Sequence, residues 1–304
     1  MSVHWYWIVG WFVTIFGFAG NSWIIFIITK RKRLQTTANC FILSLAFADL
    51  SVTCGYFPVS FACRLLFVNE CNDSIRFNFL SLFIEASMFA LIVMIAERYI
   101  AIVCPLKYVS FVTAKRVVAM VAASWGTPVL LFGARWIYNL HYNEISDQEE
   151  RIFIIFYTLL FEIAPTIILV AATLHILFIA RKISLQMSAL LTQVRFNQAT
   201  NSVINLPQTG LKMSTVRLVT AVVAIFVACY GTEIYITICE TFEVCEVTVD
   251  VQTAFSLLLM ANSVLNPFVY AFLKPDIKRE TKALFCCKNK SRLKPYCSTQ
   301  TQHV

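Results

Sequence analysis

The stretch from Ser74 to Pro105 decides the fold, and it reads S-I-R-F-N-F-L-S-L-F-I-E-A-S-M-F-A-L-I-V-M-I-A-E-R-Y-I-A-I-V-C-P. A helix rises about 1.5 Å per residue, so this mainly apolar stretch is longer than the roughly 30 Å hydrocarbon core of a bilayer. One carboxylate, Glu85, lies mid-span, and a charged pair, Glu97-Arg98, lies near the end. Pro105 then ends or bends the helix, because proline cannot continue the backbone hydrogen-bond pattern. The stretch therefore predicts a membrane-spanning helix with charged groups at its centre and its end.

The composition of the whole chain agrees with a membrane protein. Of its 304 residues, 59% are hydrophobic and only 14% are charged, and the mean hydropathy is +0.71. A soluble domain carries about 25% charged residues. The composition therefore excludes a large soluble core.

Six further apolar stretches are long enough to cross a bilayer. They cover approximately residues 5–29, 39–67, 115–138, 152–180, 216–239 and 251–273. The polar stretch 181–214 between the fifth and sixth spans is expected to be a loop. After the last span, Pro275 and Asp276 can start a short helix with apolar and basic faces. We predict an all-α membrane protein, a seven-transmembrane helix bundle over 1–273 with a short amphipathic cytoplasmic eighth helix in the tail, 274–304.

The distribution of charge orients the bundle. The net charge is +8, and in this helix order 21 of the 25 Lys and Arg residues fall on the side that holds the first loop and the tail. The positive-inside rule places that side in the cytoplasm and the N-terminus outside the cell. The first span follows no positively charged leader or cleavage site, so we expect a signal-anchor helix. The basic residues flank the membrane, which argues against nucleic-acid binding.

Several polar side chains lie inside the predicted membrane region. Asp49 is in the inner half of the second span, and Asn21 lies near the same depth in the first. Asn262 and Asn266 share a helix face, because they are four residues apart. An unpaired carboxylate at such a depth is costly and marks a functional site by default. Oxygen ligands of this kind suit a small cation, and the alternative is a hydrated polar cluster that only packs helices.

The motifs along the chain resemble those of rhodopsin-like (class A) G-protein-coupled receptors. They are G-N at 20–21, L-A-F-A-D at 45–49, E-R-Y-I-A-I-V-C-P-L-K-Y at 97–108 and N-P-F-V-Y at 266–270, with Trp125 and Pro165, and the resemblance covers about residues 10–287. It implies a plasma-membrane receptor that binds an extracellular ligand between its helices and promotes nucleotide exchange on a heterotrimeric G protein. It implies no enzyme activity and no required cofactor. A transporter or a membrane enzyme is the alternative, but the chain has no internal repeat, metal-ligand spacing or nucleophile motif.

The resemblance also implies two sets of site residues. The G-protein coupling set is Glu97, Arg98, Tyr99, Pro105, Leu106, Asn266, Pro267 and Tyr270. The set for a sodium ion, Na+ at Asp49, is Asn21, Asp49, Ser87, Asn262, Ser263 and Asn266.

The ligand site is expected between the outer halves of the helices. Leu80 stands where amine receptors carry an Asp, which argues against a standard amine receptor. The last span has no lysine for a retinal Schiff base, so the chain is not a retinal opsin. Glu85, Glu162 and Glu233 favour a cationic ligand or a proton if they converge, whereas Glu85 and Glu162 alternatively face neighbouring helices. The expected pocket set is Leu80, Ile84, Glu85, Tyr157, Phe161, Tyr230, Glu233 and Ser256.

The sixth span departs from the family pattern. Residues 226–232 read F-V-A-C-Y-G-T, so Tyr230 and Thr232 replace the usual Trp and Pro. The cytoplasmic end of this span has no acid that could pair with Arg98. We therefore expect measurable signalling without ligand.

The cysteines also depart from that pattern. No Cys lies between Cys104 and Cys229, so the bridge from the third span to the second outer loop cannot form. Local disulfides are expected instead, and buried free thiols are the alternative; the candidates are Cys63 with Cys71 and Cys239 with Cys245. Cys286 and Cys287 follow the tail helix as palmitoylation candidates, and Asn72 begins a glycosylation sequon.

Overall fold

The computed structural model describes residues 4–66, 73–140, 146–197 and 209–290. Its helices are α1 (His4–Lys30), α2 (Thr37–Gly55), α3 (Phe57–Leu66), α4 (Asp73–Val103), α5 (Pro105–Phe111), α6 (Ala114–Leu140), α7 (Asp147–Thr158), α8 (Ala164–Asn197), α9 (Thr209–Phe242), α10 (Val249–Leu273) and α11 (Pro275–Lys290). A short 3₁₀ turn, Lys32–Leu34, follows α1, and a π-helical turn, Leu159–Ile163, joins α7 to α8. Cys71 and Asn72 lie outside the described residues.

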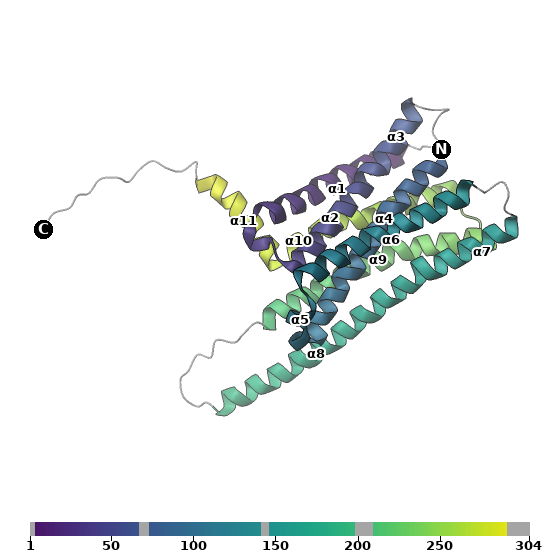
Figure 1. Cartoon of the computed structure of the whole chain (residues 1–304). Coiled ribbons are helices and arrows are strands. Elements are labelled where there is room, and N and C mark those ends of the chain that lie inside the picture. The colour runs from purple at the N-terminus through teal and green to yellow at the C-terminus, as the bar shows by residue number, and fades with distance from the viewer. Residues whose placement is uncertain (1–3, 67–72, 141–145, 198–208, 291–304) are drawn as a thin grey trace, which may run out of the picture.

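The described residues contain seven helical stretches that are long and apolar enough to cross a membrane. They lie side by side in one bundle, with the N-terminus at one end and α11 at the other (Figure 1). α4 is the central helix, because it packs against α2, α6, α8 and α9. The predicted seven-helix bundle is confirmed.

The core of the bundle is formed by the face of α4 that points inward. Met88, Leu91, Met94 and Ile95 are each at most 2% exposed. The lipid-facing helices keep many large apolar side chains on the surface, such as Phe178 of α8. This distribution is normal in a bilayer, where lipid replaces water around the outer faces.

Glycines bring α1 close to its neighbours. A Cβ atom at Gly10 would lie 1.9 Å from the ring of Phe57, and one at Gly17 would lie 2.4 Å from Thr53. Gly20 likewise faces Pro267 of α10, at 2.9 Å. Small residues at these positions let helix backbones approach each other, which favours packing in membranes.

Prolines mark the ends and irregularities of the helices. Pro105 begins α5 directly after α4 ends, and Pro275 begins α11 after α10. The π-helical turn ends just before Pro165, whose missing N–H cannot make a regular backbone bond. A π turn adds one residue to the helix and changes which side chains face the bundle interior.

The expectation that residues 181–214 form a loop is wrong for most of that stretch. α8 continues to Asn197 and α9 already begins at Thr209, so both helices extend past the spans that we expected. Residues 181–197 contain Leu, Gln, Met and Ala and no Gly or Pro, and such residues favour helix. Figure 1 shows α8 reaching beyond the ends of its neighbours.

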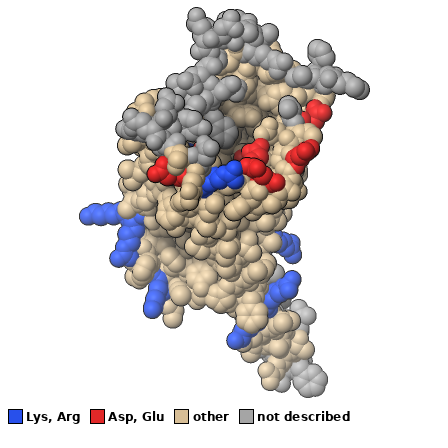
Figure 2. Space-filling view, turned by 90° about the vertical axis from the view of Figure 1, so that its right-hand side faces the viewer, with Lys and Arg blue, Asp and Glu red and all other residues tan. Residues whose placement is uncertain are grey.

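The predicted tail helix is α11, and its two faces differ as expected. Ile277 is fully buried against the bundle, whereas Arg279 is exposed. Cys286 and Cys287 lie in its last turns. On the face in Figure 2, the acidic side chains gather towards one end of the molecule and most basic ones towards the other.

Candidate functional site

A cavity of about 700 Å³ opens between the helices at the end of the bundle that holds the start of α4 and the end of α9. Its wall is mainly apolar and is formed by α2, α4, α6, α7, α9 and α10, with residues of α1 at its edge. Seven members of the expected pocket set line it: Leu80, Ile84, Glu85, Tyr157, Tyr230, Glu233 and Ser256. Its size and character suit a small organic ligand.

Phe161 is the expected pocket residue that the structure places elsewhere. Its ring packs against Tyr157, with 5.4 Å between the ring centroids, and it is not part of the cavity wall. The π-helical turn 159–163 shifts the register here, so that Glu162 faces the cavity instead. The alternative in which Glu162 only faces a neighbouring helix is therefore wrong.

Glu85 forms an ion pair that the sequence analysis did not foresee. Arg135 of α6 places Nη1 2.8 Å from Glu85 Oε1, and the Tyr157 hydroxyl donates a hydrogen bond to the same oxygen. The Arg135 guanidinium also lies over the Tyr157 ring, 5.1 Å from its centroid. Both charged side chains are at most 14% exposed. The sequence did contain a signal for this ion pair, because an arginine inside an apolar span requires a partner.

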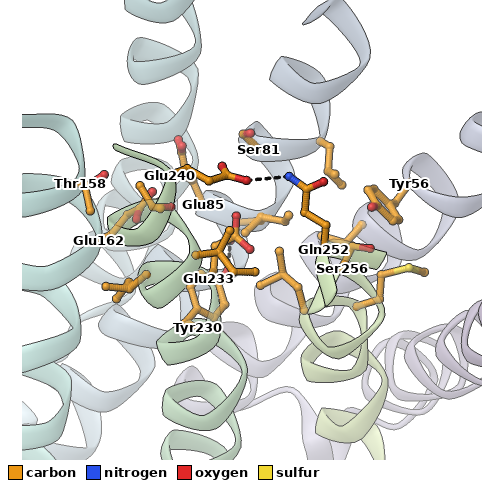
Figure 3. A pocket seen from close by; sticks show the side chains of 18 of the residues that line it. Tyr56, Ser81, Glu85, Thr158, Glu162, Tyr230, Glu233, Glu240, Gln252 and Ser256 are labelled. Atoms are coloured by element: carbon orange, nitrogen blue, oxygen red, sulfur yellow. Dashed lines mark hydrogen bonds between the residues drawn. The ribbon is translucent and has the colours of Figure 1, made fainter. Parts of the chain in front are cut away.

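The remaining carboxylates of the cavity come from three elements: Glu233 and Glu240 from α9, Glu162 from the π-helical turn, and one from α10; the first three are labelled in Figure 3. Glu162 and Glu233 are close enough to repel each other, and no cation among the described residues pairs with either. Glu240 lies farther out and accepts a hydrogen bond of 2.7 Å from the Gln252 side-chain amide. Asp250, at the start of α10, also lines the cavity.

Tyr230 closes the inner end of the cavity. Its ring stacks on Phe226, with 4.1 Å between centroids, and its hydroxyl donates to the Ile84 carbonyl at 2.9 Å. The smaller ring that replaces tryptophan therefore gains a hydrogen bond across to α4. This bond ties the sixth span to the third.

A buried polar cluster surrounds Asp49, deeper in the bundle. Ser87 Oγ donates to Asp49 Oδ1 at 2.7 Å, and Asn266 Nδ2 donates to Oδ2 at 2.9 Å. Asn21 Nδ2 donates to the backbone carbonyl of Ser263 at 3.0 Å. Each of these side chains is at most 3% exposed. The structure thus brings the expected sodium set together from four helices.

Three buried oxygens in this cluster have no hydrogen-bond donor among the described residues. They are the Oδ1 atoms of Asn21, Asn262 and Asn266. An acceptor buried without a partner costs about 1–3 kcal/mol. A bound cation would use these oxygens together with the Asp49 carboxylate, so the donor set fits the ion that the motifs imply.

The E-R-Y motif lies at the opposite end of the bundle from the cavity. Arg98 Nε lies 2.7 Å from Glu97 Oε2, and the Tyr108 hydroxyl of α5 donates to Glu97 Oε1 at 2.6 Å. Burial and the bond to Glu97 raise the pKa of the Tyr108 hydroxyl. Tyr99 instead meets His175 of α8, with 2.8 Å between the hydroxyl oxygen and Nδ1. Glu97 is therefore the carboxylate that holds Arg98.

The last turn of α10 completes this end of the molecule. Tyr270 is fully buried, one turn after Asn266 and Pro267. Of the two remaining members of the coupling set, Pro105 is exposed at the start of α5 and Leu106 is 97% exposed. Such an exposed apolar side chain is available to a partner protein.

Two contacts link α9 and α2 to this end of α10. Ser214 Oγ donates to the Leu273 carbonyl at 2.6 Å, although α9 has no acid here. Lys274 donates to the Asn39 side chain and pairs with Asp276 at 3.8 Å. Burial lowers the pKa of Lys274 to about 8, and Asp276 opposes that change. Ser214 had no distinguishing signal in the sequence, because its partner is a backbone carbonyl.

One expected disulfide is present in the described part of the chain. Cys239 and Cys245 are bonded, with their Cα atoms 5.0 Å apart. Cys63 is also in a disulfide, and its expected partner, Cys71, lies outside the described residues. The Cys239–Cys245 bond confirms one of the predicted local disulfides, which differ from the family's bridge between the third span and the second outer loop.

Comparison with known proteins supports the motif analysis. The sequence profile described as "7 transmembrane receptor (rhodopsin family)" matches residues 20–270. "Adenosine receptor A2a" of Canis lupus familiaris is 23% identical over 287 residues, which cover 86% of this chain and 67% of that receptor. "Melanocortin receptor 5" of Pan troglodytes is 24% identical, covering 88% and 80% of the two chains. "5-hydroxytryptamine receptor 4" of Rattus norvegicus is 26% identical, covering 95% and 78%.

Proposed function

Because this chain belongs to the rhodopsin family of seven-transmembrane receptors, we propose that it binds a small cationic ligand in its outer cavity and activates a heterotrimeric G protein at its opposite end. Membership of the family makes it a multi-pass protein of the plasma membrane, and the family needs no cofactor. The basic side of the bundle faces the cytoplasm in this proposal, so the N-terminus is extracellular.

The charge of the cavity carries the cationic-ligand proposal. Among the described residues, five carboxylates and one arginine line the cavity. That arginine, Arg135, is already bound to Glu85. The cavity therefore keeps an excess of negative charge in a mainly apolar environment, where an opposite charge is attracted strongly.

The named relatives support a receptor but do not agree on one ligand. Their names refer to adenosine, melanocortin and 5-hydroxytryptamine, at 23–26% identity to this chain. In this proposal Glu233 of α9 pairs with the cationic group of the ligand, because Leu80 of α4 carries no charge. The ligand is accordingly proposed from the cavity and not from a relative.

The coupling role is assigned to Arg98. Its guanidinium sits at the cytoplasmic end of α4 and is held by Glu97, and Leu106 is exposed nearby on α5. We expect Arg98→Ala to abolish nucleotide exchange on a G protein in membranes while surface expression stays normal. Arg116→Ala is the matched control, because Arg116 is at the same end of the bundle and contacts the last residues of α5, where it bonds the Ser110 and Phe111 carbonyls and lies over the Phe111 ring. Undiminished exchange by Arg98→Ala would remove the coupling proposal.

The cluster around Asp49 is assigned to sodium. The three amide oxygens that have no hydrogen-bond partner among the described residues support this role, together with the buried carboxylate. If sodium binds only the inactive form, agonist affinity should fall as sodium rises from zero to physiological concentration, with potassium replacing it as the control. Asp49→Asn keeps the size of the side chain and should make affinity independent of sodium. Equal affinity in sodium and potassium in the unmodified receptor would refute the assignment.

A further inference from the structure

We propose that the ligand is a linear diamine or polyamine, whose first ammonium group lies between Glu162 and Glu233 and whose second lies beside Glu240. This inference rests on the proposed function and specifies the class of cation. It follows from the placement of the carboxylates along the cavity (Figure 3).

The inner position holds two carboxylates that form no ion pair within the described part of the chain. Glu162 Oε2 is buried and has no hydrogen-bond partner among the described residues. Glu233 repels Glu162 across the cavity, and both are at least partly buried. Like charges in such a setting are costly unless one carboxylate takes up a proton or a cation lies between them. A primary ammonium group has three donors and can serve both side chains.

Glu85 gives a second, independent indication of a ligand at the inner position. It is only 8% exposed, and its charge is balanced by Arg135 through Oε1. Its other oxygen, Oε2, has no hydrogen-bond partner in the described part of the chain. A buried carboxylate oxygen normally accepts a hydrogen bond, and an ammonium group in the cavity would supply the donor.

The outer position is two helical turns away. Glu240 follows Glu233 by seven residues on α9, which places both on one face about 10 Å apart along the axis. The partner of Glu240 is the neutral amide of Gln252, so its charge remains unbalanced. One ammonium group cannot contact both carboxylates, because ion pairs form at about 4 Å or less.

The wall of the cavity is mainly apolar between and around the two positions. On α9, Ile236 and Thr237 line the cavity between Glu233 and Glu240, so a methylene chain has apolar surface to lie against. A polyamine combines such a chain with terminal charges, whereas a monoamine of equal length would leave Glu240 without a cation. The cavity therefore selects for the number of cationic groups and their spacing.

The test compares spermidine with n-nonylamine, a monoamine with the same number of chain atoms. The readout is nucleotide exchange on a panel of G proteins in membranes that contain the full chain. We expect spermidine to be about three- to fivefold more potent, because the exposed outer pair is worth up to about 1 kcal/mol. Thermal unfolding of the solubilised receptor with each amine gives a second readout that does not depend on coupling.

Matched variants separate the two positions. Glu240→Gln keeps the acceptor for Gln252 and should lower only the potency of spermidine, about three- to fivefold. Glu233→Gln removes a half-buried anchor and should lower the potency of both amines about 30-fold. Glu246→Gln is the control, because Glu246 is an exposed acid outside the cavity wall.

Each outcome decides between the proposals. Equal potency and equal thermal stabilisation by the two amines would overturn the diamine inference and leave the cationic-ligand proposal standing. Equal effects of Glu240→Gln and Glu246→Gln on the potency of spermidine would also overturn it. The negative charge of the outer surface as a whole would then explain the preference for spermidine over the monoamine. If neither amine nor any other cationic molecule binds or evokes exchange, the proposed function itself fails at the ligand.

Discussion

Separating Arg135 from Glu85 should destabilise the receptor more than any surface charge change. The two side chains are 14% and 10% exposed, and their charged atoms are 2.8 Å apart. Removing one partner of a buried ion pair leaves the other charge uncompensated, which costs about 3–5 kcal/mol. Arg135→Met and Glu85→Gln should each therefore lower the unfolding temperature by about 6–10 °C, at roughly 2 °C per kcal/mol for a chain of this size.

The double variant tests the cause of that loss. In Glu85→Gln with Arg135→Met, no charge remains unpaired, so the unfolding temperature should lie above that of either single variant. The control is Arg151→Met, because Arg151 pairs with Glu243 where the side chains are 52% and 70% exposed. That change should cost at most about 2 °C. The measurement is thermal unfolding of the purified, detergent-solubilised receptor. Single variants as mild as Arg151→Met, or a double variant whose losses simply add, would refute the reasoning.

Two further changes test contacts within the bundle. Ser214→Ala removes the hydrogen bond to the end of α10, so ligand-free nucleotide exchange should rise about two- to tenfold. The control, Ser188→Ala within α8, should leave that exchange unchanged. Equal exchange in the two variants would show that the Ser214 bond does not restrain α9. Gly10→Ala places a methyl group 1.9 Å from the buried ring of Phe57 and should lower the unfolding temperature by several degrees. Gly126→Ala meets no atom within 4 Å and should be neutral or slightly stabilising, so similar effects of the two substitutions would contradict the packing argument.

The expectation of ligand-free signalling stays a prediction, but the structure adds two contacts that oppose it. The Tyr230 hydroxyl holds the Ile84 carbonyl, and Ser214 holds the Leu273 carbonyl. Each joins α9 to another helix without using a charged group. Both involve backbone acceptors, and a sequence does not reveal which carbonyl a side chain will reach. The missing acid on the sixth span therefore does not leave that span without restraint.

The sequence predicts where polar side chains meet inside the bundle better than it predicts which way apolar side chains point. Asp49, Ser87 and Asn266 meet as expected, since a polar group in a span must find a polar partner inside the bundle. The opposite case is Phe161, which was expected in the cavity wall and lies outside it. Large apolar side chains occur on every side of its span, so they contain little information about which face points inward.

The sequence by itself determined the number of spans, their order and the ends marked by prolines. It did so because a bilayer requires long apolar helices whose backbone groups are all hydrogen-bonded internally. Only the tertiary structure decided that Arg135 neutralises Glu85 and that Glu162 turns into the cavity. The first contact joins residues of different helices, and the second depends on a local π turn that shifts the register by one residue. The ion pair depends on how α4 packs against α6, and the π turn on the backbone before Pro165, and neither follows from the order of polar and apolar residues.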